Sequence, residues 1–172
     1  CPGASPWCRK HCYAGRLERL RPNCRRAYAR NLALSLDPDT FVRRLLDALP
    51  EDARLVRVHV GGDFYSPEYA VAWSRICAAR PDTQFWAYTR SWSVRALLPP
   101  LERLRTQANV RLFASLDPDM PLPPSGWRVA FLDFDPRANG TPCRHQQGEV
   151  ESCLECGYCF RQHAGNVVFK VH

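Results

Sequence analysis

Residues 55–63 read L-V-R-V-H-V-G-G-D, a run rich in β-branched residues that stops at two glycines. The run predicts a strand over residues 55–60, and the glycines predict the turn that ends it. A helix is predicted to start soon afterwards, because Pro67 suits the first helical position behind Ser66. A strand, a short turn and a helix together make the repeating unit of a parallel α/β protein.

The same pattern repeats on both sides of this stretch. Helices are expected at residues 25–36, 40–49 and 93–105. Further strands are expected at residues 84–89, 110–116, 129–132 and 167–171. Successive strand and helix units pair in parallel through right-handed crossovers. Because so few strands cannot close an eight-stranded barrel, we expect an α/β fold with a partial, open parallel β/α barrel and a cysteine-rich C-terminal loop.

The length and hydropathy of the chain indicate how many domains it has and whether it crosses a membrane. A chain of 172 residues suits a single domain, residues 1–172. We expect the partial barrel and an N-terminal cluster loop in residues 1–135, and a cysteine-rich tail with a final strand in residues 136–172. Asp39 or Thr40 is expected to cap its helix. No run approaches the roughly 18 apolar residues of a membrane span, so a cytoplasmic protein without a membrane partner is expected.

Polar residues follow the predicted strands where a site is expected. In parallel α/β proteins, ligands bind at the carboxyl ends of the strands. Glycines there let a ligand approach the backbone, and an acidic side chain suits an amino group. The candidate ligand-binding residues are Gly61, Gly62, Asp63, Ser115 and Asp117.

Eight of the nine cysteines form two groups near the ends of the chain. The N-terminal group is Cys1, Cys8, Cys12 and Cys24, and the C-terminal group is Cys143, Cys153, Cys156 and Cys159. Two-residue gaps, as in the last three, let one loop point its thiolates at one metal centre. The grouping therefore predicts two metal sites. Cys77 lies alone in a helical stretch and is interpreted as a small buried hydrophobe.

Three chemistries suit grouped thiols. Disulfides are disfavoured, because the chain has no apolar signal segment and exceeds the size of small stapled scaffolds. Zinc would make two closed, structural sites and is kept as an alternative. Iron–sulfur clusters are favoured, since they also allow three-cysteine ligation with an open iron.

The N-terminal cysteines end in Cys12-Tyr13-Ala14, and this motif resembles the radical S-adenosylmethionine (SAM) superfamily, above all its small phage-encoded members. The resemblance covers about residues 1–135. It implies that Cys1, Cys8 and Cys12 hold a 4Fe–4S cluster whose fourth iron binds SAM. The spacing here is C-x6-C-x3-C, whereas the superfamily uses C-x3-C-x2-C, and Cys24 stays open as a fourth ligand.

Further roles follow from the same resemblance. It implies that Gly61, Gly62 and Asp63 receive the amino group of SAM, and that Ser115 and Asp117 meet its carboxylate or ribose. The tail is similar to loops that bind an auxiliary cluster, which implies that Cys143, Cys153, Cys156 and Cys159 hold a second cluster. An enzyme of this type takes SAM as its small-molecule partner and needs an electron-donor protein.

Aromatic and histidine residues offer secondary candidates. Aromatic side chains expected near the mouth of the pocket are Trp7, Tyr13, Phe64, Tyr65, Trp86, Tyr88 and Trp92. His59 is interpreted as a core or pocket residue, and His11 as an alternative metal ligand. His145 and His163 flank the C-terminal cysteines and are able to replace one ligand there.

Charge points to an alternative partner. The chain carries a net charge of +7, and many arginines crowd one segment: Arg16, Arg19, Arg21, Arg25, Arg26 and Arg30. Such a stripe either forms a solvated helix face or follows nucleic-acid phosphates. Two other functions therefore remain open: a two-zinc module that binds nucleic acid, and an iron–sulfur protein without SAM chemistry.

Overall fold

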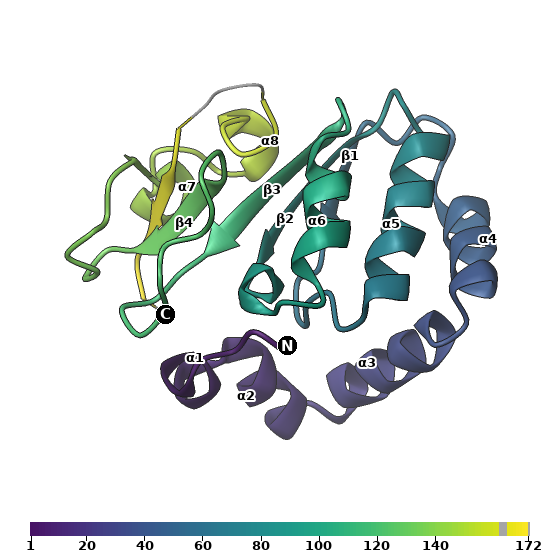
Figure 1. The fold of residues 1–172 in the computed structure, drawn as a ribbon, viewed down its shortest axis with the longest axis horizontal. Helices are drawn as coiled ribbons and strands as arrows, with labels where there is room; N and C mark the ends of the chain where they lie inside the picture. The colour runs from purple at the N-terminus through teal and green to yellow at the C-terminus, as the bar shows by residue number, and fades with distance from the viewer. Residues whose placement is uncertain (162–164, 172) are drawn as a thin grey trace.

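A computed structural model describes residues 1–161 and 165–171 of the chain. Its strands form one six-stranded sheet in the order β1-β2-β3-β4-β6-β5 (Figure 1). The strands are β1 Leu55–Val58, β2 Gln84–Thr89, β3 Val110–Ser115, β4 Arg128–Leu132, β5 Thr141–Pro142 and β6 Val167–Phe169. Every neighbouring pair is parallel, so the predicted parallel α/β fold is confirmed. The sheet is open, with β1 and β5 at its two edges.

The helices occupy the sequence before, between and after these strands. They are α1 Pro6–His11, α2 Tyr13–Leu20, α3 Pro22–Ser35, α4 Pro38–Ala48, α5 Pro67–Ala79, α6 Leu98–Arg105, α7 Arg144–Gln147 and α8 Cys153–Cys156, with a short 3₁₀ turn at Ser91–Ser93. None of the described helices is long and apolar enough to cross a membrane.

The two faces of the sheet carry different side chains, because successive residues of a strand point to opposite faces. One face packs against α4, α5 and α6 and forms the main hydrophobic core, with Phe85, Leu112 and Phe131 from the strands. Phe113, Ala130 and Val167 belong to a second, smaller core on the other face. We call this other face of the sheet the inner face. Residues of the C-terminal tail pack against it.

The strand at residues 55–60 was predicted too long. The structure ends β1 at Val58, and His59 adopts a left-handed backbone with a φ of 64°. This conformation is uncommon for a residue other than glycine and cannot continue a strand. The chain turns at that point into Gly61 and Gly62.

Two helix signals were also misplaced. Asp37 caps α4, since its carboxylate accepts the backbone N–H groups of Asp39 and Thr40, so the predicted cap lies two or three residues too late. The helix predicted at residues 93–105 begins only at Leu98, and Pro99 and Pro100 stand in its first turn. The first N–H groups of a helix have no partner within the helix, so proline is tolerated there.

Candidate functional site

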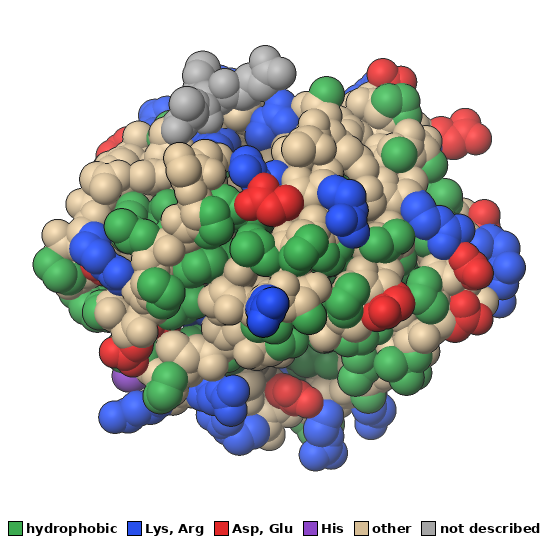
Figure 2. Space-filling view, viewed as in Figure 1, with side chains coloured by type: hydrophobic (Ala, Val, Ile, Leu, Met, Phe, Trp, Pro, Cys, Tyr) green, Lys and Arg blue, Asp and Glu red, His purple; other side chains and the backbone are tan. Residues whose placement is uncertain are grey.

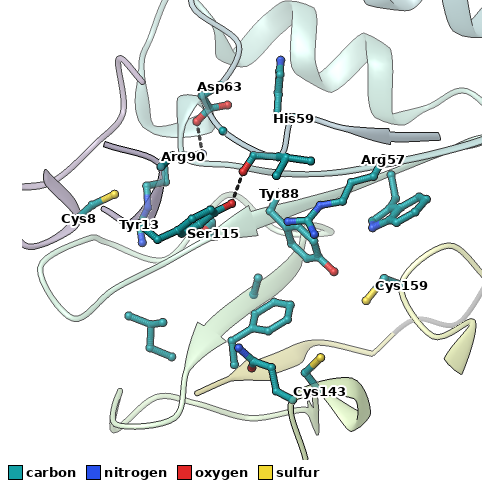
Figure 3. Close-up of a pocket in the computed structure, with 18 of the residues that line it drawn as sticks. Cys8, Tyr13, Arg57, His59, Asp63, Tyr88, Arg90, Ser115, Cys143 and Cys159 are labelled. Atoms are coloured by element: carbon teal, nitrogen blue, oxygen red, sulfur yellow. Dashed lines mark hydrogen bonds between the residues drawn. The ribbon is translucent and has the colours of Figure 1, made fainter. Parts of the chain in front are cut away.

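One cavity of about 350 Å³ joins the two cysteine groups (Figure 3). The cysteines that line it are Cys1, Cys8 and Cys12 from the start of the chain, and Cys143, Cys153, Cys156 and Cys159 from the tail. Cys24 is not among the lining residues. Cys77 is 1% exposed within the main core, which confirms its interpretation as a buried hydrophobe.

Asp63 organises the carboxyl ends of β1 and β2. Its carboxylate accepts hydrogen bonds from the Thr89 hydroxyl at 2.6 Å and from the backbone N–H groups of Arg90 and Phe64 at 2.8 Å each. Burial raises the pKa of this carboxyl, and the hydrogen bonds oppose the rise. Both oxygens are thus engaged by the protein, and Asp63 fixes the turn after β2.

Asp117 fixes the turn after β3 in the same way and also contacts the N-terminal segment. Its side chain is fully buried, accepts the Ser5 hydroxyl at 2.6 Å and forms an ion pair with Arg90. The other carboxylate oxygen accepts the N–H of Asp119. Ser115 lines the cavity, and its hydroxyl has no hydrogen-bond partner among the described residues.

The two glycines after β1 serve different purposes. A Cβ at Gly61 would lie 2.7 Å from the Tyr28 hydroxyl and 3.0 Å from Ala14 Cβ, so glycine allows α2 and α3 to pack against this turn. Gly62 has a φ of +88°, which favours glycine, and nothing lies near its Cβ direction. Of the pair, Gly62 therefore leaves room for a ligand.

The N-terminal cysteines lie against these strand ends. Ser5 caps α1 by accepting the N–H of Cys8, and Cys12 caps α2 by accepting the N–H of Gly15 with its sulfur. Burial raises the pKa of the Cys8 thiol, while the neighbouring Arg90 guanidinium lowers it. The thiols are therefore held at helix starts, beside the polar turns of β2 and β3.

The C-terminal cysteines occupy the inner face of the sheet. Cys143 and Cys159 pack against the smaller core. The Tyr88 hydroxyl points toward the Cys159 thiol (Figure 3), whose pKa burial raises to about 11. Arg57 lies near Cys153 and lowers the pKa of that thiol against the effect of burial. Apolar packing positions Cys143 and Cys159, and the Arg128 guanidinium adds hydrogen bonds to the carbonyls of Tyr158 and Cys159.

The thiols do not converge on a single point in either group. Among the described residues, no three His, Cys, Asp or Glu side chains lie close enough together to hold one metal ion. All nine cysteines are free thiols. The donor chemistry fits soft metals, because each group offers at least three thiols on the wall of a largely apolar cavity. Metal binding by either group stays a prediction and requires the thiols to move together.

Some of the aromatic and histidine candidates line the cavity. Trp7, Tyr13, Trp86 and Tyr88 line the cavity, but Phe64, Tyr65 and Trp92 do not. His11 and His145 line it too. His59 lines it as well, with its ring packed against Phe64, Tyr69 and Trp73. His163 lies outside the described residues. The sequence analysis missed Arg57 and Phe169 as lining residues. The alternation of side chains along β1 and β6 was a signal that both point to the inner face of the sheet.

The arginine stripe is an exposed surface on and between α2 and α3. All six side chains are exposed, and none takes part in an ion pair with a described residue. Basic side chains gather along the lower edge of the molecule in Figure 2, and in the same view α1 to α3 run along that edge (Figure 1). We call Arg16, Arg19, Arg21, Arg25, Arg26 and Arg30 the arginine surface.

Fold and site together define a class of protein: an open, all-parallel α/β sheet whose cavity is lined by cysteines from both ends of the chain. A family model described as Gene product 88 matches residues 1–133, and the chain belongs to this family.

Two curated phage proteins resemble the chain over most of its length. It is 31% identical over 199 aligned residues to the Gene 88 protein of Mycobacterium phage L5, covering 99% of this chain and 81% of the relative. It is 29% identical over 189 residues to the Gene 88 protein of Mycobacterium phage D29, covering 92% and 77% respectively. No solved structure matches the chain.

Proposed function

We propose that this chain is an iron–sulfur enzyme of the radical SAM type. Cys1, Cys8 and Cys12 hold a 4Fe–4S cluster that binds SAM, and the four cysteines of the tail hold a second cluster. One observation carries the proposal: both cysteine groups line a single cavity on a parallel sheet. A cofactor held by the N-terminal cysteines would therefore lie in the same cavity as the C-terminal cysteines.

The strand order supports a partial barrel as the scaffold. Strands β1 to β4 are neighbours in chain order, so right-handed crossovers put the connecting helices on one face, as in a barrel. A doubly wound sheet reverses its order and carries helices on both faces. The inner face is then free to form the floor of the cavity.

The polar network supports the N-terminal group as the SAM site. Through its bond to Asp117, Ser5 ties the helix that carries Cys8 to the end of β3. Asp63 and Asp117 act by shaping the turns, since their oxygens are already engaged. Ser115 and Gly62 offer the hydroxyl and the open backbone that a ligand in the cavity can contact.

When bound, the cluster supplies the electron that cleaves a carbon–sulfur bond of SAM reductively. This chain has to position SAM and to keep water and stray hydrogen donors away. Trp7, Tyr13 and Trp86 line the cavity and supply apolar surface for that purpose. An electron-donor protein is then a partner, as is SAM itself.

Anaerobic reconstitution with iron and sulfide tests the proposal. We expect brown protein with acid-labile sulfide, and 5′-deoxyadenosine after reduction in the presence of SAM. Iron and sulfide without SAM cleavage would leave an iron–sulfur protein of another kind. Stoichiometric zinc without labile sulfide in protein purified anaerobically would favour the structural zinc alternative.

The arginine surface favours a second candidate, nucleic-acid binding. Its exposed guanidinium groups suit phosphates, and such binding weakens steeply with salt. Filter binding with single-stranded and duplex DNA between low and moderate salt tests it. Arg25→Gln with Arg26→Gln is expected to weaken binding and flatten the salt dependence, while the same changes at Arg43 and Arg44 on α4 serve as the control.

A further inference from the structure

Arg57 stands on the inner face of the sheet within the same cavity. It lies on β1 in register with Trp86 of β2, and its guanidinium lies 5.5 Å from the centre of the Tyr88 ring. In Figure 3 the Arg57 side chain extends along the sheet toward Tyr88, between the two cysteine groups. A cation over an aromatic face is fixed in place without losing its charge.

The charge of Arg57 is not neutralised by the protein. Four lining residues carry a full charge: Arg57, Asp63, Arg90 and Lys170. Asp63 is engaged by three donors, and Arg90 pairs with Asp117. In the part of the chain that the structure describes, the guanidinium of Arg57 forms no ion pair and no hydrogen bond. The cavity therefore presents one guanidinium fork that is free to accept an anion.

Aromatic rings line the cavity that holds this cation. Trp86 contacts Phe160 with ring centroids 5.4 Å apart, and Tyr88 meets Phe169 edge to face at 5.2 Å. These four rings all line the cavity. Ligand sites typically combine such apolar walls with a small number of polar groups that set orientation. Here the polar group is a guanidinium, which suits the two oxygens of a carboxylate or phosphate.

We propose that the cavity binds a small organic anion, with Arg57 holding its carboxylate or phosphate and the rings of Trp86 and Tyr88 contacting its apolar or aromatic body. This inference rests on the proposed function in one respect: the anion is the molecule on which the SAM chemistry acts. Arg57 lines the same cavity as both cysteine groups, so a molecule bound there shares that cavity with both.

The competing role for Arg57 is a countercharge for the C-terminal thiols, because it lies near Cys153. The two roles differ in what is lost when the cation is removed. A countercharge would be needed for metal loading, whereas a recognition residue would be needed only for the organic anion.

Binding of simple probes separates these roles. Benzoate, phenyl phosphate and the neutral analogue benzamide are titrated by calorimetry and by ligand-detected NMR into the protein as purified and after reconstitution. We expect benzoate or phenyl phosphate to bind at least tenfold more tightly than benzamide, and the preferred anion to identify the group. Arg57→Met should weaken anion binding by roughly 10- to 100-fold and leave benzamide unchanged. Arg111→Met removes an arginine of β3 that does not line the cavity, and is the matched control.

Iron content and SAM cleavage complete the test. If Arg57→Met binds the anions as the parent does, or if it loses iron in proportion to anion binding, the proposal is overturned. Intact iron content and SAM cleavage with lost anion binding supports it. Should the parent contain no labile sulfide, the proposed function fails, yet the probe titrations on purified protein still decide whether Arg57 binds anions.

Discussion

The two cysteine groups are positioned by different balances of polar and apolar contacts. The N-terminal thiols lie against buried carboxylates, an ion pair and capped helix starts at the carboxyl ends of β2 and β3. In the C-terminal group, Cys143 and Cys159 pack on an apolar floor formed by Phe113, Ala130 and Val167. Cys153 and Cys156 lie on α8, which ends at the left-handed Gly157, and Arg128 bonds to the carbonyl of Cys159. Polar networks fix direction, whereas apolar packing mainly stabilises. Changes in the first group should therefore alter chemistry, and changes in the second should alter stability.

The largest expected effect separates Cys8 from Cys24. Cys8→Ala should abolish SAM cleavage and remove about four iron atoms per chain, because three thiolates are the fewest that hold the proposed cluster. Cys24→Ala should retain both, since Cys24 does not line the cavity. Iron and sulfide analysis with a 5′-deoxyadenosine assay gives the readout. Equal losses in both variants would mean a closed, four-cysteine site instead.

The next effect should appear in stability and only in the C-terminal group. Cys156→Ala breaks a closed set of four thiols, and metal binding at such a site contributes several kcal/mol or more to folding. We expect a large fall in Tm or insoluble protein, against a small change in Tm for Cys8→Ala. The comparison breaks down if thermal unfolding of metal-loaded protein shows Cys8→Ala to be the more destabilised variant.

The stability of the fold should fall in acid because of His59, which lies just after β1. Burial lowers the pKa of His59 to about 4 from its ordinary value of 6.5. The folded state therefore disfavours the protonated ring, so its stability is fully present above pH 6.5 and declines as the pH falls toward 4. Over that window the loss amounts to about 3 kcal/mol.

His59→Asn isolates this contribution. Asparagine does not titrate in this range and tolerates the left-handed backbone that His59 adopts. Denaturant unfolding of the two proteins at pH 7 and pH 4.5 is expected to show a smaller pH effect in the variant. If both lose the same free energy of unfolding, His59 is not the acid-sensitive group.

Hydrophobic periodicity was sufficient to predict most of the fold. The β2 strand matches its predicted limits, and the parallel order follows from strand and helix alternation. The helices α1 and α2 were not predicted: α1 is short and buries no side chain, whereas α2 has Ala14, Leu17 and Leu20 at helical spacing and was therefore detectable. His59 also ended β1 early, since its left-handed backbone leaves no mark on the pattern of side chains.

The site was predictable in its parts but not in its connections. Cysteine spacing indicated the two groups, and the strand-end rule indicated Asp63 and Asp117. Both carboxylates accept hydrogen bonds from Thr89, Arg90 and Ser5. These contacts join residues far apart in the chain, so the sequence pattern did not indicate them. The same holds for Arg57, which matters because its neighbours across the sheet are aromatic and none is acidic.

The smallest expected effect compares two serine caps. Ser5 caps α1, which carries Cys8, and Ser152 caps α8, which carries Cys153 and Cys156. Replacing a serine cap with alanine costs about 1 kcal/mol. Ser5 also donates to the buried carboxylate of Asp117, while Ser152 donates no hydrogen bond to another described side chain.

Ser5→Ala should therefore lower the free energy of unfolding by about 1 kcal/mol more than Ser152→Ala does, because a buried carboxylate loses a donor. It should also slow SAM cleavage, since α1 loses its anchor to the end of β3. Denaturant titration and the SAM cleavage assay on both variants provide the two measurements. A Ser152→Ala variant that loses as much stability and activity as Ser5→Ala would show that a cap alone accounts for the effect. The polar network would then not distinguish the two cysteine groups.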